Sequence, residues 1–368
     1  MRVAIHAGTL RGAGSRAVGS ALVRELSRLE TPHRFIAFVP GEWPLESSVV
    51  AKMMVLKTRP GLARKFALEN LVLPRALRAA RCDALLSLGD TSSLSPQRPH
   101  LLFVQQAFLA YRERDWGFSP RPRMRARMRM MAAYFQAGLP RVDRIVVQTE
   151  DMRLHLSERW RLGADRVHVI PSAVGGDVLA RNASEPPPRS PTRLVSVTSA
   201  GPHKNIELFP ALLAALPPRH DAVRLTLTLT RSDAPALVAE AERLGVADRI
   251  DFVGAVTRAD VIQLLQGAAI AVSPSHLESF GIGYYEALAL GTPQVVADLG
   301  FAREACGDAA RYADADAPEE FAARVTELLD SEQARRESSL AARKRFEAIH
   351  VPWTEIARRY LRHLEAIA

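Results

Sequence analysis

The chain has 368 residues, 48% hydrophobic and 24% charged, so it is long enough for two ordinary domains with buried cores and too apolar to be disordered. Residues 1–180 hold 28 basic and 15 acidic residues, a net +13, whereas residues 181–368 hold 21 and 25, a net −4. The basic half is expected to attract polyanions, which include nucleic acid, anionic lipid head groups and phosphorylated substrates.

Short apolar runs alternate with helical patterns through the first half of the chain. They fall at residues 3–6, 19–29, 34–38, 83–86, 101–104, 144–147, 150–160 and 167–170. This alternation is typical of a parallel sheet covered by helices.

A Pro- and Ser-rich stretch at residues 181–191 interrupts the alternation and predicts a linker. The alternation then resumes at residues 194–197, 205–215, 224–228, 235–244, 250–253, 259–266, 270–272, 283–290 and 294–296. Helical sequence fills residues 318–368, with an interruption at Pro352. We therefore predict an α/β protein with two facing, doubly wound Rossmann-like domains, residues 1–180 and 181–350, with ligands beyond the carboxyl ends of the strands.

The cellular location follows from what the sequence lacks. Its two cysteines, Cys82 and Cys306, provide no disulfide framework, which favours a reducing compartment. The first residues turn polar too early for a signal peptide, and no run of 18 apolar residues occurs. We expect a cytoplasmic protein, with the inner face of the cell membrane as its place if it binds a membrane.

Residues 111–144 form a basic segment with nine arginines against three acidic residues. Wound as a helix, it aligns four apolar side chains in one stripe flanked by arginines: Met124, Met128, Met131 and Phe135. Two interpretations stay open. Either the stripe packs on the domain core and the arginines are solvated, or the helix makes a peripheral contact with an anionic membrane, anchored by Trp116 and Phe118. No recognised nucleic-acid module appears, so nucleic acid is not an expected partner.

The most informative stretch covers residues 273–293, where a strand ends in a polar turn and a helix follows. Gly281 and Gly283 leave backbone N–H groups accessible at the start of that helix, which suits a phosphate. Glu278 precedes the helix and Glu286 lies within it, roughly 12 Å apart if the whole segment is helical. This span suits a diphosphate with a carboxylate at each end. Taken singly, the same residues also fit an ordinary tight turn and a solvated glutamate.

Taken together, the stretch resembles the most diagnostic motif of retaining GT-B glycosyltransferases of family 4. Ser-Phe-Gly follows Glu278, and Glu286 begins Glu-Ala-Leu-Ala-Leu-Gly-Thr-Pro after seven intervening residues. The resemblance covers nearly the whole chain, including residues 201–206 and 249–254. It implies a GT-B fold in which a last helix, residues 351–368, crosses back and packs on the N-terminal domain.

The resemblance also implies roles for individual residues. As catalytic residues, Glu278 would hold donor-sugar hydroxyls near the anomeric carbon, and Lys204 would neutralise the diphosphate leaving group. Glu286 would accept hydrogen bonds from the ribose hydroxyls. The further donor-binding residues would be Ser279, Phe280, Gly281, Ile282, Gly283, His203, Val253 and Gly254. The co-substrate would be a GDP- or UDP-linked sugar, and no metal or other cofactor is expected.

The sequence departs from the family pattern at several positions. The usual arginine before Lys204 is absent near Ser199, and His203 either replaces this cation in part or faces solvent. Gln105 stands where the family has a histidine. The glycine-rich loop after the first strand is expected over the cleft, which makes Gly12, Gly14 and Arg16, with Gln105, the candidate acceptor or cleft-loop residues.

These observations predict a retaining hexosyltransferase that moves a sugar, with mannose as the first choice, from a nucleoside diphosphate to a lipid-linked or surface-polysaccharide acceptor, as in lipopolysaccharide synthesis. One alternative is a GT-B sugar-nucleotide epimerase or phosphorylase. Another is a non-catalytic protein that binds polyanions or nucleotide sugars.

Overall fold

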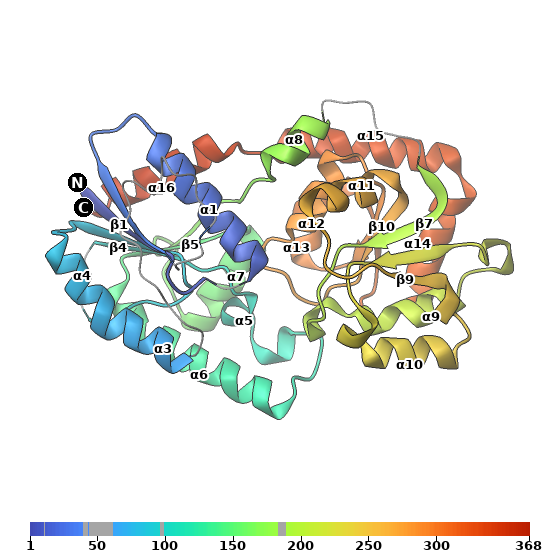
Figure 1. The fold of residues 1–368 in the computed structure, drawn as a ribbon, viewed down its shortest axis with the longest axis horizontal. Helices are drawn as coiled ribbons and strands as arrows, with labels where there is room; N and C mark the ends of the chain where they lie inside the picture. Colours follow the sequence, from blue (N-terminus) through green and yellow to red (C-terminus); the bar gives the residue numbers. More distant parts are fainter. Residues whose placement is uncertain (11, 40–42, 44–61, 96–98, 183–188) are drawn as a thin grey trace. The chain divides into compact units, whose positions relative to one another are not determined.

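The computed structural model describes all residues except 11, 40–42, 44–61, 96–98 and 183–188, so most of the predicted linker lies outside the described residues. The chain forms two compact units (Figure 1). The first comprises Met1–Glu113, Arg121–Ser172 and Val351–Ala368, and the second comprises Arg114–Pro120 and Ala173–His350. Each is built on a six-stranded sheet. All strand pairs are parallel, which confirms the predicted pair of Rossmann-like domains.

The sheet of the first unit has the strand order β2-β1-β3-β4-β5-β6. The strands are β1 (Arg2–His6), β2 (Arg34–Phe38), β3 (Ala84–Ser87), β4 (His100–Phe103), β5 (Arg144–Val147) and β6 (Val167–Val169). β3 and β4 are buried along their whole length, because helices cover both faces of a parallel sheet. The strand order reverses between β1 and β3, so the loops after these two strands meet at one edge.

The helices of the first unit surround this sheet. They are α1 (Ala13–Arg28), α3 (Leu62–Ala67), the π-helix η1 (Leu68–Val72), α4 (Leu73–Ala79), α5 (Ala107–Ala110), α6 (Pro122–Gly138), α7 (Glu150–Trp160) and α16 (Trp353–Glu365). The α7 helix begins where the Thr149 side chain accepts a hydrogen bond from the Met152 N–H. The last helix, α16, packs on α1 and so completes the first unit from the far end of the chain.

The basic segment contains α6, which forms as the periodicity predicts. Met128 and Phe135 are buried, and the Phe135 ring packs on the Trp160 ring with centroids 5.1 Å apart. Met124 and Met131 are half-buried, so the apolar stripe packs inward and does not face a bilayer. Trp116 is only 2% exposed. The expectation that it anchors the protein in a membrane is therefore wrong, because protein atoms already cover its ring.

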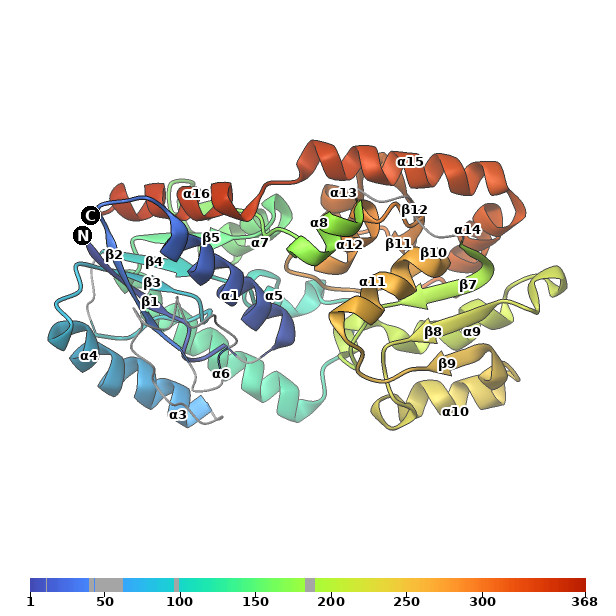
Figure 2. The same cartoon turned by 45° about the horizontal axis from the view of Figure 1, so that its top comes forward.

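The sheet of the second unit has the strand order β12-β11-β10-β7-β8-β9 (Figure 2). Its strands are β7 (Ser190–Ser196), β8 (Arg224–Leu227), β9 (Ile250–Phe252), β10 (Ala268–Ser273), β11 (Gln294–Ala297) and β12 (Ala310–Ala313). The order reverses between β7 and β10, which places the loops after these strands at the usual ligand position of an open α/β sheet.

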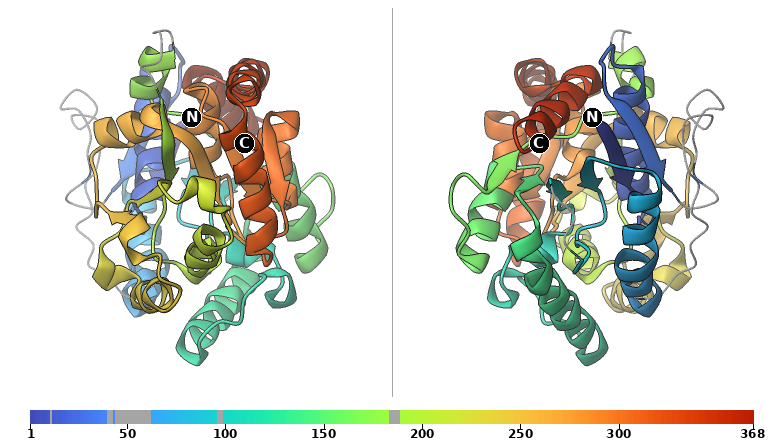
Figure 3. Two further views of the ribbon diagram at one scale, coloured as in Figure 1. Left: turned by 90° about the vertical axis from the view of Figure 1, so that its right-hand side faces the viewer. Right: turned by 90° about the vertical axis from the view of Figure 1, so that its left-hand side faces the viewer.

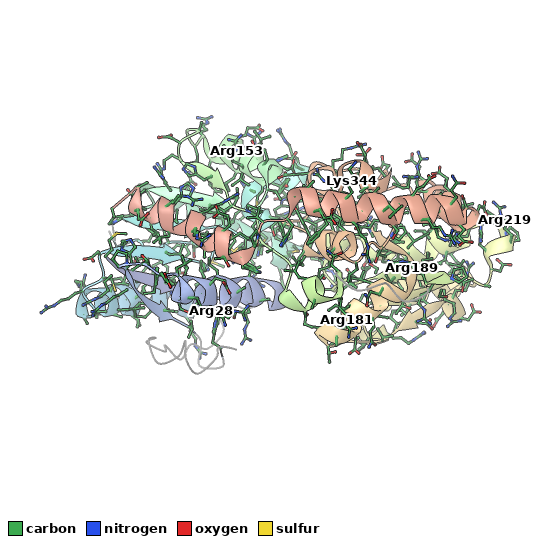
Figure 4. All side chains as sticks on the ribbon, turned by 90° about the horizontal axis from the view of Figure 1, so that it is seen from above. Arg28, Arg153, Arg181, Arg189, Arg219 and Lys344 are labelled. Carbon is green, nitrogen blue, oxygen red and sulfur yellow. The ribbon has the colours of Figure 1, made fainter. Side chains whose placement is uncertain are left out.

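The second unit packs helices on both faces of this sheet (Figure 3). They are α8 (Gly176–Asn182), α9 (Phe209–Ala214), α10 (Pro235–Arg243), α11 (Arg258–Gly267), α12 (Ile282–Ala289), α13 (Gly300–Cys306), α14 (Pro318–Asp330) and α15 (Glu332–Ile349). Arg189, labelled in Figure 4, donates hydrogen bonds to the carbonyl oxygens of Leu265 and Leu290, both at 2.9 Å. One guanidinium thus binds the carboxyl ends of α11 and α12 together.

Candidate functional site

Two loops at the reversal point of the second sheet carry the predicted donor residues. The loop after β7 contains the short 3-10 helix η4 (Pro202–Lys204), and the loop after β10 leads to α12. The His276 N–H donates a 2.8 Å hydrogen bond to the His203 carbonyl oxygen, which holds the two loops together.

The structure brings the two predicted catalytic side chains into contact. Lys204 Nζ donates to Glu278 Oε1 at 2.6 Å, and the side chains are 21% and 13% exposed. Both charges therefore lie at the surface of a partly desolvated site, where a cation is worth more than in bulk water. The pair offers one positive group for a phosphate and one carboxylate for sugar hydroxyls.

His203 is half-buried beside Lys204, so its ring faces solvent only in part. Burial, together with the nearby Lys204 charge, lowers the pKa of His203 to about 4. The imidazole is therefore neutral at neutral pH and does not replace the missing cation there.

The α12 helix begins at Ile282, later than an all-helical segment from Glu278 would require. Its N-cap is Gly281, at φ +69°, where a Cβ atom would lie 2.4 Å from the Tyr284 ring. Phe280 is buried and stacks on Tyr285 with ring centroids 4.1 Å apart, while Ser279 and Ile282 are half-buried. The roughly 12 Å separation of the two carboxylates, which assumed a helix throughout, has no basis in this geometry.

Gly283 occupies the second position of α12. A Cβ atom added there would meet nothing within 4 Å, so its backbone faces open space. Together with the Gly281 turn, this leaves a helix N-terminus that a phosphate can approach closely.

Glu286 lies inside α12 and is 4% exposed. Burial raises the pKa of its carboxyl group, and Arg258 opposes that shift. Arg258 Nη1 donates to Glu286 Oε1 at 2.6 Å, and Arg258 Nε donates to Asp177 Oδ2 at 3.2 Å. Sequence reasoning missed Arg258 and Asp177. The available signal was the capping box of Thr257 and Asp260, which places Arg258 at the first position of α11.

Val253 and Gly254 follow the edge strand β9. Lys204 and Glu278 follow the central strands β7 and β10, and β8 separates β9 from β7. Their N–H groups bond the carbonyl oxygens of Leu227 and Leu229. Val253 is 44% exposed. Both residues line an open groove of about 970 Å³, together with Arg193, Thr226, Thr230, Arg231, Ser232, Ile250, Asp251, Phe252 and Leu264. The groove has the size of a small-molecule site, but its lining does not include Glu278, Lys204 or Glu286.

The predicted residues of the first unit follow β1 and β4, but only Gly12 and Gln105 precede or lie outside a helix; the expectation that Gly14 and Arg16 lie in a glycine-rich loop is wrong, because α1 begins at Ala13. Gly12 caps α1, and Gly14 has open space where a Cβ would project. Arg16 is half-buried in the first turns of the same helix. Gln105 is fixed by its backbone N–H, which donates to Asp90 Oδ1 at 2.6 Å, and by its side chain, which donates to the Leu88 carbonyl oxygen at 3.2 Å.

A buried polar cluster at the same edge was not predicted as a site. Glu69 is fully buried in the π-helix η1, and its Oε2 accepts hydrogen bonds from Thr91 at 2.9 Å and Tyr134 at 2.7 Å. His6 Nε2 and Lys65 Nζ lie 3.6 and 3.7 Å from its Oε1. Burial would raise the pKa of Glu69, but Lys65, His6 and Tyr134 together lower it below its usual value. Glu69 lies in a π-helix, and no simple sequence pattern predicts a π-helix.

The described residues contain no group of three or more His, Cys, Asp or Glu side chains arranged to hold a metal ion. The expectation that no metal is needed stays a prediction. None of the helices in the described part of the chain has the length and apolar character required to cross a membrane.

Solved structures with the same architecture define the class of fold. WaaG, a glycosyltransferase involved in lipopolysaccharide biosynthesis, aligns over 98% of this chain and 99% of its own with a TM-score of 0.74 and 15% identity. HepE of Anabaena in complex with UDP aligns over 99% of both chains, with a TM-score of 0.71 and 16% identity. The fold is therefore that of the GT-B glycosyltransferases.

The sequence narrows the class further. Residues 180–345, which fall in the second unit, match the family model described as "Glycosyl transferases group 1". D-inositol 3-phosphate glycosyltransferase of Segniliparus rotundus is 30% identical over 199 residues, which cover 51% of this chain and 44% of that protein. This chain spans about half the length of the relatives that it matches.

Proposed function

We propose that the protein is a metal-independent, retaining glycosyltransferase of family 4 that uses a GDP- or UDP-linked sugar. The contact between Lys204 and Glu278 beside the start of α12 carries this proposal. Lys204 supplies a cation and the start of α12 supplies N–H groups for the diphosphate, while Glu278 supplies a carboxylate for the sugar. Departure of a nucleoside diphosphate requires these groups. The group 1 domain match and the UDP complex of a protein with the same fold support it.

The mechanism follows from the same groups. As the bond between the anomeric carbon and the phosphate oxygen breaks, negative charge grows on the diphosphate, and Lys204 and the α12 N–H groups stabilise it. Glu278 would orient the sugar, and no residue is assigned as a covalent nucleophile. Retention would then require the acceptor oxygen to attack from the face that the leaving group vacates, with the departing phosphate taking the acceptor proton.

We infer that the acceptor carries phosphate, as a lipid-linked glycan or a sugar phosphate. The net +13 of residues 1–180 supports this, as do the names of relatives that act on inositol phosphate or take part in lipopolysaccharide synthesis. Mannose stays our first choice of sugar on the sequence resemblance alone.

The test is a donor screen with the full chain, in which GDP- and UDP-sugars are offered with lipid phosphate and sugar phosphate acceptors and products are detected by mass. Glu278→Gln and Lys204→Ala should each lower transfer by about 100- to 1,000-fold, because each removes a group that acts in the transition state. Arg219→Met, at a surface pair with Asp330, is the matched control. Near-normal turnover in either site variant would contradict the assigned roles. Consumption of donor without any acceptor would favour an epimerase or a related activity.

We propose that membrane contact, if the acceptor is a lipid, uses the solvent face of the first unit around α3, η1 and α6. Four exposed apolar side chains lie on these elements: Phe66, Leu71, Val72 and Met130. The Phe66 ring lies 5.4 Å from that of Tyr134, which joins α3 to α6, and Arg123 and Arg127 are exposed on the same helix. Each arginine near an anionic membrane surface contributes about 1 kcal/mol to the free energy of membrane binding.

Sedimentation with vesicles tests this surface. Vesicles rich in phosphatidylglycerol should bind the protein, and the double variant Arg123→Glu with Arg127→Glu should bind them at least tenfold more weakly. Equal binding to neutral phosphatidylcholine vesicles would contradict the proposal. Transfer to a soluble acceptor should be unchanged in this variant.

A further inference from the structure

Arg258 contacts Glu286, the carboxylate that the sequence resemblance assigns to the ribose, and it comes from a different helix. The α8 helix packs on both α11 and α12 in the second unit (Figure 2). Asp177 lies at the start of α8, Arg258 is the first residue of α11, and Glu286 lies within α12. Arg189 binds the carboxyl ends of both α11 and α12, and so holds these two helices relative to each other.

The guanidinium of Arg258 uses two of its three nitrogens. Nη1 donates to Glu286 Oε1 at 2.6 Å, and Nε donates to Asp177 Oδ2 at 3.2 Å. No described residue accepts a hydrogen bond from Nη2, and the Arg258 side chain is 51% exposed. The third nitrogen of the fork is therefore directed to a ligand or to water.

The Glu286 carboxylate is also used on one side only. Its Oε1 accepts from Arg258, whereas within the described residues no donor bonds its Oε2. The side chain is nevertheless 5% exposed, so its remaining acceptor capacity is enclosed and oriented. A ribose has two neighbouring hydroxyl groups, each of which donates and accepts. Glu286 Oε2 offers an acceptor and Arg258 Nη2 offers a donor, which are the two kinds of group that such hydroxyls can bind.

We propose that Arg258 is a positioning and specificity-determining residue of the donor site, which, anchored on Asp177, holds Glu286 as an acceptor and so selects nucleotides with an intact ribose diol. This inference rests on the proposed function, because it takes the protein to use a nucleotide sugar, and it takes Glu286 as the ribose ligand that the sequence resemblance implies. It adds a residue from outside the motif that contains Glu278 and Glu286.

Titration of Glu286 provides a readout that a purely structural role of Arg258 would not move. Burial raises the pKa of Glu286, Arg258 lowers it, and Asp177 raises it. The other charged groups on helices that pack against α12 bind elsewhere or are exposed: Arg343 bonds the Asn182 carbonyl, Arg345 bonds the Ala305 and Glu304 carbonyls, Arg303 pairs with Asp298, and Arg181 is exposed. Without Arg258, the carboxyl group should therefore protonate at a higher pH and lose its capacity to accept two hydroxyl donors.

Calorimetric titration of the full chain with UDP, GDP, 2′-deoxy-UDP and 2′-deoxy-GDP tests the proposal. We expect the unaltered protein to bind one ribonucleotide at least about tenfold more tightly than its deoxy counterpart, since a hydrogen bond to a charged group is lost. Arg258→Met should bring the ratio of the two affinities to within about twofold at the acidic end of a pH series, with partial recovery as the pH rises. Arg258→Lys should keep an intermediate ratio, because a single ammonium cannot bridge two carboxylates as a guanidinium does.

Two variants make the outcomes distinct. Arg219→Met, which removes an exposed and paired arginine labelled in Figure 4, should leave the ratio unchanged. Glu286→Gln should abolish the preference for the ribonucleotide over its deoxy counterpart at every pH. Failure of the unaltered protein to bind any nucleotide would overturn the proposed function. A ribose preference lost in Glu286→Gln but retained in Arg258→Met would overturn this inference and leave the proposed function in place. If the Met variant does not fold, Arg258→Gln, which retains a polar side chain, gives the same comparison.

Discussion

Each unit places a buried glutamate at the carboxyl edge of its sheet, and the two glutamates differ in what remains free. Glu69 is fully enclosed, with two hydroxyl donors on Oε2 and two basic side chains near Oε1. Glu286 has a single partner, and that partner is half-exposed. Glu69 Oε1 has no hydrogen-bond partner among the described residues, but it is closed to solvent and lies beside two basic side chains, so a ligand cannot reach it. The half-exposed partner of Glu286 leaves room for a ligand beside that carboxylate. We therefore propose a structural role for Glu69 and a binding role for Glu286.

The largest effect is expected where the enclosed glutamate is removed. Glu69→Ala should lower the free energy of unfolding by about 3 kcal/mol, because the Thr91 and Tyr134 hydroxyl groups lose their buried acceptor and Lys65 loses the adjacent negative charge. Urea denaturation and hydrogen exchange of β1 and β3 measure the loss. Nucleotide affinity should stay within about twofold. A stable protein with a large loss of nucleotide binding would reverse the roles assigned to Glu69 and Glu286.

The acid sensitivity of the first unit provides the next test. His100 is buried in β4, and burial lowers its pKa to about 4. Its Nδ1 faces the Arg141 carbonyl at 3.3 Å, so Nδ1 carries the proton and Nε2 accepts from the Ser87 hydroxyl at 2.9 Å. Because the unfolded chain binds a proton near pH 6.5 and the fold does not, stability should fall as the pH drops from about 6.5 to about 4.

The slope from this one histidine is at most roughly 1.4 kcal/mol per pH unit. Urea titrations at several pH values should show that His100→Gln removes part of the slope, whatever its effect at pH 7. An unchanged slope would mean that other groups, such as His203 or His363, dominate the acid response.

The smallest of the three effects sharpens the binding side of the comparison. Gly283→Ala adds a methyl group into open space at the start of α12, so the melting temperature should stay the same or rise slightly. The same methyl should lower nucleotide affinity by about tenfold, because it occupies the approach of a phosphate to the helix N–H groups. Affinity equal to that of the unaltered protein would place the phosphate elsewhere.

The sequence predicted the sheets well because their strands are continuous apolar runs. The expected helix at residues 150–160 and strand at 144–147 match α7 and β5 residue for residue. The short strand β12 and the π-helix were not predicted, since neither has a distinctive period. The helix at Glu286 was predicted, but its first residue depends on the left-handed Gly281 turn.

The residues of the candidate site fall into the same two groups, predicted and not predicted. Lys204, Glu278 and Glu286 were predicted because they lie in short motifs. Arg258 and Asp177 were not, because packing of three helices brings them together and no spacing in the sequence records it. The basic helix α6 was predicted as a helix, but periodicity alone does not say whether an apolar stripe faces the protein or a membrane.

Arg189 links two helices of the second unit. Its guanidinium binds the final carbonyl groups of α11 and α12, and burial lowers its pKa only to about 10, so it stays charged at physiological pH. One charged side chain therefore links the carboxyl ends of two helices that carry Arg258 and Glu286, so neither end can separate from the other without breaking these hydrogen bonds.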